Sequence, residues 1–114
     1  MSRRYCLTLD LKNDADLIRR YEEYHKKVWP EIISSISDSG IEQMQIYRFG
    51  TRLFMIMEVS DDFSFESKAQ MDGNNEKVQQ WEALMWTYQQ ALTEAAPGEK
   101  WMLMDKIFDL SEFK

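Results

Sequence analysis

The order of hydrophobic patterns along the chain constrains the fold more than any other feature. Alternation with a period of two residues predicts strands, and spacing of three and four residues predicts helices. In chain order the predicted elements are a strand at 4–12, a helix at 17–28 that breaks at Pro30 and resumes to Gly40, strands at 41–49 and 53–59, helices at 63–71 and 76–92, and a strand at 101–110. This order predicts a single α+β domain over 1–114, a ferredoxin-like sandwich whose four-stranded antiparallel sheet is covered on one face by helices.

The face of the sheet without helices also carries apolar side chains. The run at 53–59 is apolar apart from Glu58, so we expect that strand to be covered on both faces. In the strand at 41–49, alternation places Ile41, Gln43, Gln45, Tyr47 and Phe49 on one face and Met44, Ile46 and Arg48 on the other. Large apolar patches mark interfaces or ligand sites, so we expect the second face to be buried in a cavity, in a dimer, or in both.

Charge and residue counts exclude several classes of function. A net charge of −6 and a pI near 4.8 disfavour nucleic acid as a partner, because phosphate backbones would be repelled. One cysteine, Cys6, and one histidine, His25, leave too few ligands for a disulfide or a transition-metal centre, so no metal is expected. The longest uncharged run, the eleven residues from Ala83 to Thr93, is too short for a membrane helix, and no signal peptide is predicted. We expect a cytoplasmic protein without membrane contact.

The most distinctive candidate residues lie on one face of the first predicted helix. Tyr21, His25 and Trp29 follow one another at four-residue spacing, so a phenol, an imidazole and an indole lie in one line. Histidine is the side chain whose ordinary pKa is closest to neutrality, which makes His25 the candidate for proton transfer. The alternative is structural: Tyr21 and Trp29 anchor the core, and His25 is a hydrogen-bonded helix residue.

Aromatic and acidic side chains supply further candidates. Trp81 lies on the apolar stripe of the helix at 76–92, either as a core residue or as a flat platform for a sugar ring. Three carboxylates are expected to be partly buried and to pair with nearby cations or to accept a hydroxyl: Glu31, Glu58 and Asp105. The cations expected as their partners are Arg48, Arg52, Lys100 and Lys106.

Several segments together resemble the L-rhamnose mutarotase family. They are the Tyr-x3-His-x3-Trp-Pro-Glu segment that begins at Tyr21, a glycine before the strand that carries Ile46 and Tyr47, the part of the next strand from Leu53 and Phe54 to Glu58, and Gln-x-Trp at Trp81. The resemblance covers nearly the whole chain, from about residue 4 to 108. It implies a homodimer of ferredoxin-like subunits, a dimeric α/β barrel, that interconverts the α and β anomers of a deoxyhexose without metal or organic cofactor.

The resemblance also implies roles for individual residues. His25 takes the position of the proton donor, Tyr21 that of a substrate-binding residue beside it, and Trp81 that of a substrate-binding aromatic. Trp29 matches the motif as well, and we expect it to help hold the ring. On this hypothesis His25 donates a proton to the ring oxygen, and Tyr21 or a carboxylate handles the anomeric proton.

Two positions depart from the rhamnose-type pattern. Met44 stands where the family has a substrate-contacting tyrosine, and Glu82 stands where it has a second tryptophan. A carboxylate in place of an indole suits a differently placed hydroxyl, so the expected substrate is a 6-deoxy-L-hexose, L-fucose ahead of L-rhamnose. Two other hypotheses share the fold: a cofactor-free monooxygenase-like enzyme, and a small-ligand-binding dimeric α/β barrel protein.

Overall fold

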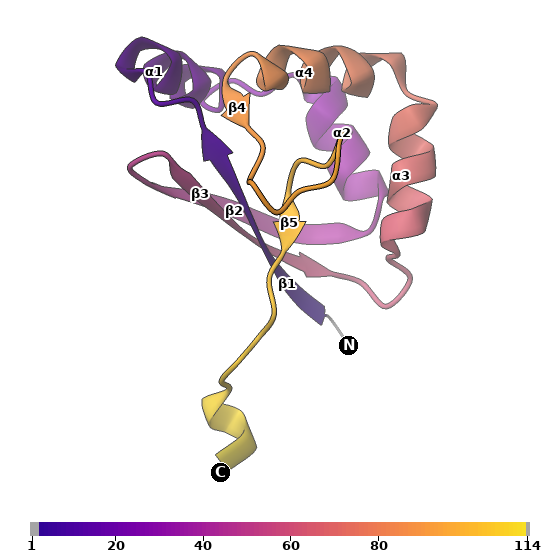
Figure 1. Ribbon diagram of the computed structural model, residues 1–114. Helices are drawn as coiled ribbons and strands as arrows, with labels where there is room; N and C mark the ends of the chain where they lie inside the picture. The colour runs from indigo at the N-terminus through magenta and orange to yellow at the C-terminus, as the bar shows by residue number, and fades with distance from the viewer. Residues whose placement is uncertain (1–2, 114) are drawn as a thin grey trace.

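The computed structural model describes residues 3–113 (Figure 1). The elements are β1 (Arg3–Leu11), α1 (Ala15–Tyr24), α2 (Pro30–Asp38), β2 (Ile41–Phe49), β3 (Arg52–Val59), α3 (Phe65–Gly73), α4 (Glu76–Trp86), β4 (Gln89–Gln90), β5 (Met102–Leu103) and the 3-10 helix η1 (Leu110–Phe113). The sheet is antiparallel in the order β2-β3-β1-β4, and β5 also pairs with β1. The four α-helices lie over one face of the sheet (Figure 1), as the predicted ferredoxin-like α+β sandwich requires.

Local signals set the starts of the helices that carry the candidate residues. The Asp14 carboxylate accepts hydrogen bonds from the backbone N–H groups of the first turn of α1, and the Asn75 side chain does the same for α4. Pro30 opens α2, where its missing N–H costs nothing. Gly40 follows α2 with φ of 100°, a conformation that favours glycine, and the chain turns there into β2.

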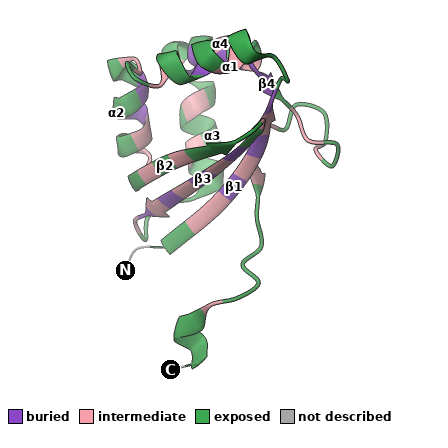
Figure 2. Ribbon diagram, turned by 90° about the vertical axis from the view of Figure 1, so that its left-hand side faces the viewer, coloured by how far each residue is buried: buried purple, intermediate pink, exposed green. Residues whose placement is uncertain are grey.

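The inner face of the sheet, which packs under the helices, is made by alternate residues of the three long strands. Leu7 and Leu9 of β1 lie opposite Met55 and Leu53 of β3, and all four are buried. In β3 the intervening residues are half-buried, so the strand is not fully covered on both faces as the sequence predicted. Its outer face instead lacks any covering element among residues 3–113 (Figure 2).

A β-bulge corrects the predicted faces of β2. The irregularity lies between Ile41 and Gln43, where Ile41 pairs with Val59 and Gln43 pairs with Glu58. The extra residue reverses the alternation, so that buried Ile41 shares the inner face with Met44 and Ile46 rather than the outer face with Tyr47. Because the pattern in the sequence has no mark for the inserted residue, the prediction for Ile41 was wrong.

The C-terminal third differs most from the prediction. The helix expected to run to residue 92 ends at Trp86, because the chain turns to pair Gln89 with Leu11, and the Tyr88 carbonyl accepts from the Lys12 N–H at 2.9 Å. The strand expected at 101–110 is reduced to β5, with one further backbone bond from Met104. Two short strands therefore share the edge of β1 that one long strand was expected to fill.

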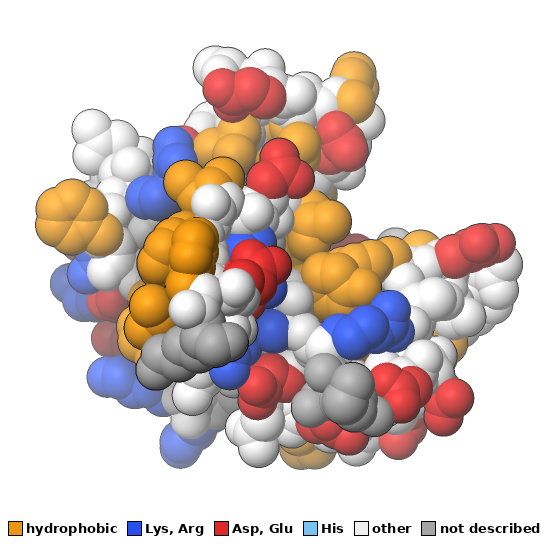
Figure 3. All heavy atoms as spheres, turned by 90° about the horizontal axis from the view of Figure 1, so that it is seen from below, with side chains coloured by type: hydrophobic (Ala, Val, Ile, Leu, Met, Phe, Trp, Pro, Cys, Tyr) orange, Lys and Arg blue, Asp and Glu red, His pale blue; other side chains and the backbone are white. Residues whose placement is uncertain are grey.

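The segment after β5 leaves the body of the molecule and ends in η1 (Figure 1). Its apolar side chains are exposed, with Ile107 95% and Phe108 66% accessible. The radius of gyration, 14.9 Å, is accordingly larger than the roughly 13 Å usual for a chain near this length. Seen from below, hydrophobic side chains gather in exposed clusters with charged side chains around them (Figure 3).

Candidate active site

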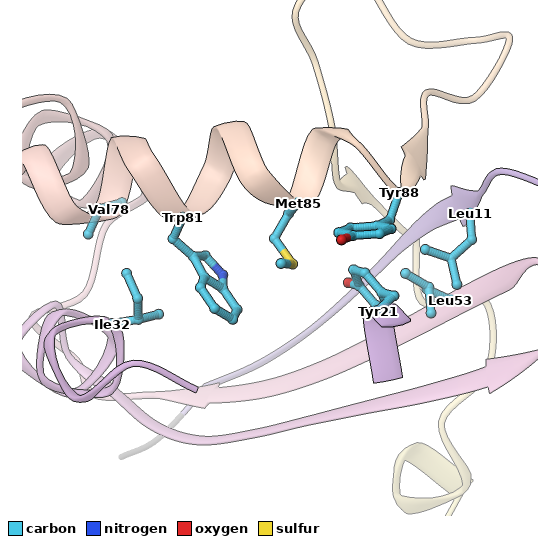
Figure 4. Close-up of a cluster of buried hydrophobic side chains, with 8 residues drawn as sticks. All are labelled: Leu11, Tyr21, Ile32, Leu53, Val78, Trp81, Met85 and Tyr88. Carbon is cyan, nitrogen blue, oxygen red and sulfur yellow. The ribbon is translucent and has the colours of Figure 1, made fainter. Parts of the chain in front are cut away.

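A cavity of about 710 Å³ opens between the helical layer and the inner face of the sheet. Its lining comes from α1, α2, α3, α4, the long strands and the segment before β5. The hydrophobic cluster beside it is formed where Trp81, Met85 and Tyr88 project from α4 and its end toward Tyr21 and Leu53 (Figure 4). The cavity thus lies where the sheet and all four helices meet, so its walls are built from residues of every part of the sandwich.

His25 lies at the C-terminal end of α1 and lines the cavity. Its ring Nδ1 is 2.8 Å from the carbonyl oxygen of Tyr21, so Nδ1 carries a proton and donates. In the neutral ring Nε2 then keeps its lone pair, and no hydrogen bond among residues 3–113 engages it. Burial lowers the pKa of His25 below 6.5, and the bond to the carbonyl opposes that shift. At neutral pH the site therefore holds a neutral imidazole with a free Nε2.

Tyr21 packs directly against His25, with ring centroids 4.4 Å apart. Its side chain is 3% exposed, and burial raises the pKa of the phenol above its ordinary value. The Tyr21 hydroxyl accepts a hydrogen bond from Gln89 Nε2 at 3.4 Å, which opposes that rise because it stabilises the phenolate. Tyr21 is thus a protonated phenol at neutral pH, with its own proton available to donate.

Trp81 and Trp29 form the aromatic end of this group. The Trp81 ring is 5.8 Å from that of His25 and 5.1 Å from that of Trp29, both at edge-on angles. Trp81 lines the cavity, whereas Trp29 lines a separate hollow with Tyr24 and Tyr88. The structure therefore brings Tyr21, His25 and Trp81 together at the cavity and leaves Trp29 as support for Trp81.

The two residues that depart from the rhamnose-type pattern both line the cavity. Met44 reaches it from the inner face of β2, and Glu82 from α4 beside Trp81. Lys100 Nζ donates to the Glu82 backbone carbonyl at 2.9 Å and lies 4.8 Å from the Trp86 ring centroid. Burial lowers the pKa of Lys100, and the nearby Glu82 charge opposes this. Glu82 and Lys100 thus bring charged side chains to the cavity wall beside Trp81.

The carboxylates chosen from the sequence lie elsewhere. Glu31 and Asp105 are exposed, contrary to the prediction, because α2 turns Glu31 outward and the expected C-terminal strand does not form. Glu58 is half-buried on the outer face of β3 and pairs with Arg4 at 3.0 Å, not with any of the four predicted cations. This pair is structural and lies on the other side of the sheet from the cavity.

The cavity also contains polar residues that sequence reasoning did not select. Gln89 is 4% exposed, and its Oε1 is buried without a hydrogen-bond partner in the part of the chain that the structure describes. At another part of the wall Lys68 Nζ pairs with Asp72 Oδ2 at 2.6 Å, and Asp72 Oδ1 has no partner among the same described residues. Nothing in the sequence separates these residues from surface polar ones, because a helix was expected through Gln89 and its burial follows from the turn into β4.

Two searches of residues 3–113 bear on other kinds of site. No three His, Cys, Asp or Glu side chains of this part of the chain are grouped as a metal site requires. None of the helices in the same range combines the length and apolar character needed to cross a bilayer.

Comparison with known proteins gives concordant results. The family model described as L-rhamnose mutarotase matches residues 4–110. An L-fucose mutarotase of Xanthomonas campestris pv. campestris is 47% identical over an alignment of 111 residues, and the match covers 96% of this chain and 89% of that protein. Two solved structures share the fold. An L-rhamnose mutarotase of Formosa agariphila has a TM-score of 0.69 at 23% identity, covering 94% of this chain and 97% of that one. A dimeric ferredoxin-like protein from an uncultured marine organism has a TM-score of 0.52 at 12% identity, covering 93% and 90%.

Proposed function

This chain belongs to the L-rhamnose mutarotase family and is an isomerase acting on carbohydrates, and from that premise we propose that it interconverts the α and β anomers of L-fucose through His25 and Tyr21. The observation that carries the proposal is the free Nε2 of a neutral His25, held beside the Tyr21 phenol and Trp81 at one cavity. Mutarotation needs only proton transfers, and this pair contains one acceptor and one donor.

The proposed cycle opens and closes the ring with the same two groups. His25 Nε2 accepts the proton of the anomeric hydroxyl, the bond between C1 and the ring oxygen breaks, and the Tyr21 hydroxyl gives its proton to that ring oxygen. The C1 aldehyde then turns about the bond to C2. In closing, the ring oxygen attacks C1 from the other side, returns its proton to Tyr21, and the His25 imidazolium donates to the new anomeric oxygen.

This order of steps differs from the hypothesis based on the sequence, in which His25 first donates to the ring oxygen. The lowered pKa of His25 and the raised pKa of Tyr21 support the present order, because both groups begin in their dominant forms at neutral pH. His25 remains the proton donor of the closing half-reaction. An acid or base so positioned typically supplies about 10²- to 10⁴-fold in rate.

The choice of L-fucose is supported by the 47% identity to the L-fucose mutarotase and by two side chains. Met44 and Glu82 line the cavity and replace an aromatic pair with a thioether and a carboxylate. A carboxylate accepts hydrogen bonds from sugar hydroxyls, whereas an indole offers a flat apolar surface. We therefore propose that Glu82 and Met44 contact the substrate and that Trp81 packs against its ring.

We also propose that the enzyme is a homodimer whose subunits pack through the outer sheet face and the segment after β5. Tyr47 and Phe49 on that face are 56% and 89% exposed, and Ile107 and Phe108 of the segment after β5 are exposed as well. The fold is shared with a dimeric ferredoxin-like protein, which supports this arrangement.

Saturation-transfer NMR of the sugar anomers tests the function. Adding the protein to L-fucose should accelerate exchange between the α and β C1 protons well above the rate in buffer. L-rhamnose should respond less, and an aldohexose with a 6-hydroxyl serves as a comparison. An exchange rate unchanged by the protein for every sugar in the panel would refute the proposal, and a larger acceleration for L-rhamnose would refute the choice of L-fucose.

A further inference from the structure

The cavity wall contains one buried amide with half of its hydrogen-bonding capacity unused. Gln89 belongs to β4, where its backbone pairs with Leu11 at the end of β1, and its side chain reaches the cavity. The residue is 4% exposed. Its Nε2 donates to the Tyr21 hydroxyl at 3.4 Å, and its Oε1 has no partner among residues 3–113.

A buried carbonyl oxygen without a donor is costly, so such groups in folded proteins usually have a reason. Here the backbone gives no structural reason, because the pairing of β4 with Leu11 uses main-chain atoms that any residue provides. Leucine or methionine at position 89 would fill similar space without an unpaired oxygen. The unpaired Oε1 belongs to the same amide group as the Nε2 that donates to the Tyr21 hydroxyl. Gln89 also lines the same cavity as His25.

The amide is also suited to control Tyr21. Because Nε2 donates to the phenol oxygen, the hydroxyl proton of Tyr21 is directed elsewhere, toward another acceptor. The same bond stabilises the phenolate that forms when Tyr21 gives its proton away. If the amide were turned by 180°, an unpaired N–H₂ group would stand in place of Oε1, and a sugar hydroxyl, which both donates and accepts, would satisfy either orientation.

We propose that Gln89 is a substrate-binding and positioning residue: its Oε1 accepts a hydrogen bond from a hydroxyl of the bound sugar, while its Nε2 orients the Tyr21 hydroxyl toward the ring oxygen. This rests on the proposed anomer exchange and adds a specificity determinant to it. A sugar that lacks the hydroxyl, or carries it in the other configuration, leaves the amide unpaired and is disfavoured.

The test compares Gln89→Met with Gln90→Met, a matched control one residue away whose side chain is exposed. With L-fucose as the probe, Gln89→Met should raise KM about tenfold or more and lower kcat as well, because a hydroxyl stays unpaired and Tyr21 loses its orientation. The melting temperature of Gln89→Met should equal or exceed that of the native protein, because an unpaired buried oxygen is removed. Gln90→Met should leave KM and kcat within about twofold.

A second measurement keeps the proposal testable if Gln89→Met does not fold. In native protein labelled with ¹⁵N-glutamine, the Gln89 side-chain amide signals should shift on saturation with L-fucose, and the Gln90 signals should not. An unshifted Gln89 amide, or a folded Gln89→Met with native KM and kcat, would overturn the inference while native anomer exchange still stands. Absence of exchange in the native protein would instead overturn the proposed function itself.

Discussion

The two faces of the sheet differ in what they leave unsatisfied. On the inner side, apolar groups are buried, and the groups at the cavity that find no hydrogen-bond partner within residues 3–113 are polar: the Nε2 of His25, the Oε1 of Gln89 and the Oδ1 of Asp72. On the outer face and along the segment after β5, large apolar side chains are uncovered instead, with Phe49 89% and Ile107 95% exposed. This difference is why we propose that the chain uses one face of the sheet for proton transfer and the other for assembly.

We expect the largest loss of activity from substituting His25 at the cavity. His25→Gln keeps a polar side chain of similar size but removes the titrating ring, so the rate of L-fucose anomer exchange should fall about 10²- to 10⁴-fold. Saturation-transfer NMR measures this directly. The adjacent exposed Lys26→Gln is the matched control and should keep the native rate. A His25→Gln variant with native exchange would remove His25 from the mechanism.

Substitutions of Trp81 separate its contribution to stability from its contribution to substrate binding. Trp81 is 8% exposed and contacts both His25 and Trp29, so Trp81→Ala should destabilise the fold by about 3–5 kcal/mol and lower activity with it. Urea unfolding gives the stability. Trp81→Phe keeps an aromatic surface and should lose less than half as much stability while KM still rises. If Trp81→Phe left KM for L-fucose unchanged, Trp81 would be a core residue only.

Substitutions on the outer face and in the segment after β5 should change the oligomeric state and leave the exchange rate nearly unchanged. Phe49→Asp and Ile107→Asp place charges on the proposed dimer surface and should shift the protein toward monomer, as measured by analytical ultracentrifugation. The exchange rate per folded chain should remain within about twofold, because neither residue lines the cavity. A rate that fell in proportion to the dimer fraction would show that the partner completes the site, and the comparison of faces would then be wrong.

The sequence predicted the parts of the fold that rest on local pattern. The order of elements, the full range of β2 and the break at Pro30 follow from periodicity and from proline chemistry. The bulge after Ile41 and the end of α4 at Trp86 were missed, because both depend on where a neighbouring strand pairs. A strand was predicted at 101–110 from its alternation, but among residues 3–113 the segment pairs with β1 just at β5 and through one further bond from Met104.

The candidate site likewise contains residues that the sequence predicted and residues that it did not. Tyr21, His25 and Trp81 were found because helical spacing and the family motif mark them, and Met44 and Glu82 because they depart from that motif; all five line the cavity. Gln89 carries no such mark, since its burial comes from a turn that the sequence pattern does not indicate. The buried carboxylates were predicted wrongly at Glu31 and Asp105, since the burial of a charged side chain depends on tertiary packing that periodicity does not describe.

The proton-carrier role of His25 can be tested at the single atom that the account depends on. His25 is the only histidine of the sequence, so ¹⁵N-histidine labelling of the untagged protein reports its tautomer and pKa without overlap. Burial lowers that pKa below 6.5, and the neutral form should carry its proton on Nδ1. Because His25 binds its proton more tightly in the unfolded chain, lowering the pH through this range also destabilises the fold. Circular dichroism at each pH identifies the range in which the protein is folded, and only data from that range are used.

The decisive measurement is the rate of L-fucose anomer exchange across the same pH range. The account predicts a plateau above the pKa of His25 and a fall as pH drops through it, approaching tenfold per pH unit, with the midpoint of the rate matching the midpoint from ¹⁵N NMR. A rate that stayed level or rose while His25 became protonated would contradict the account.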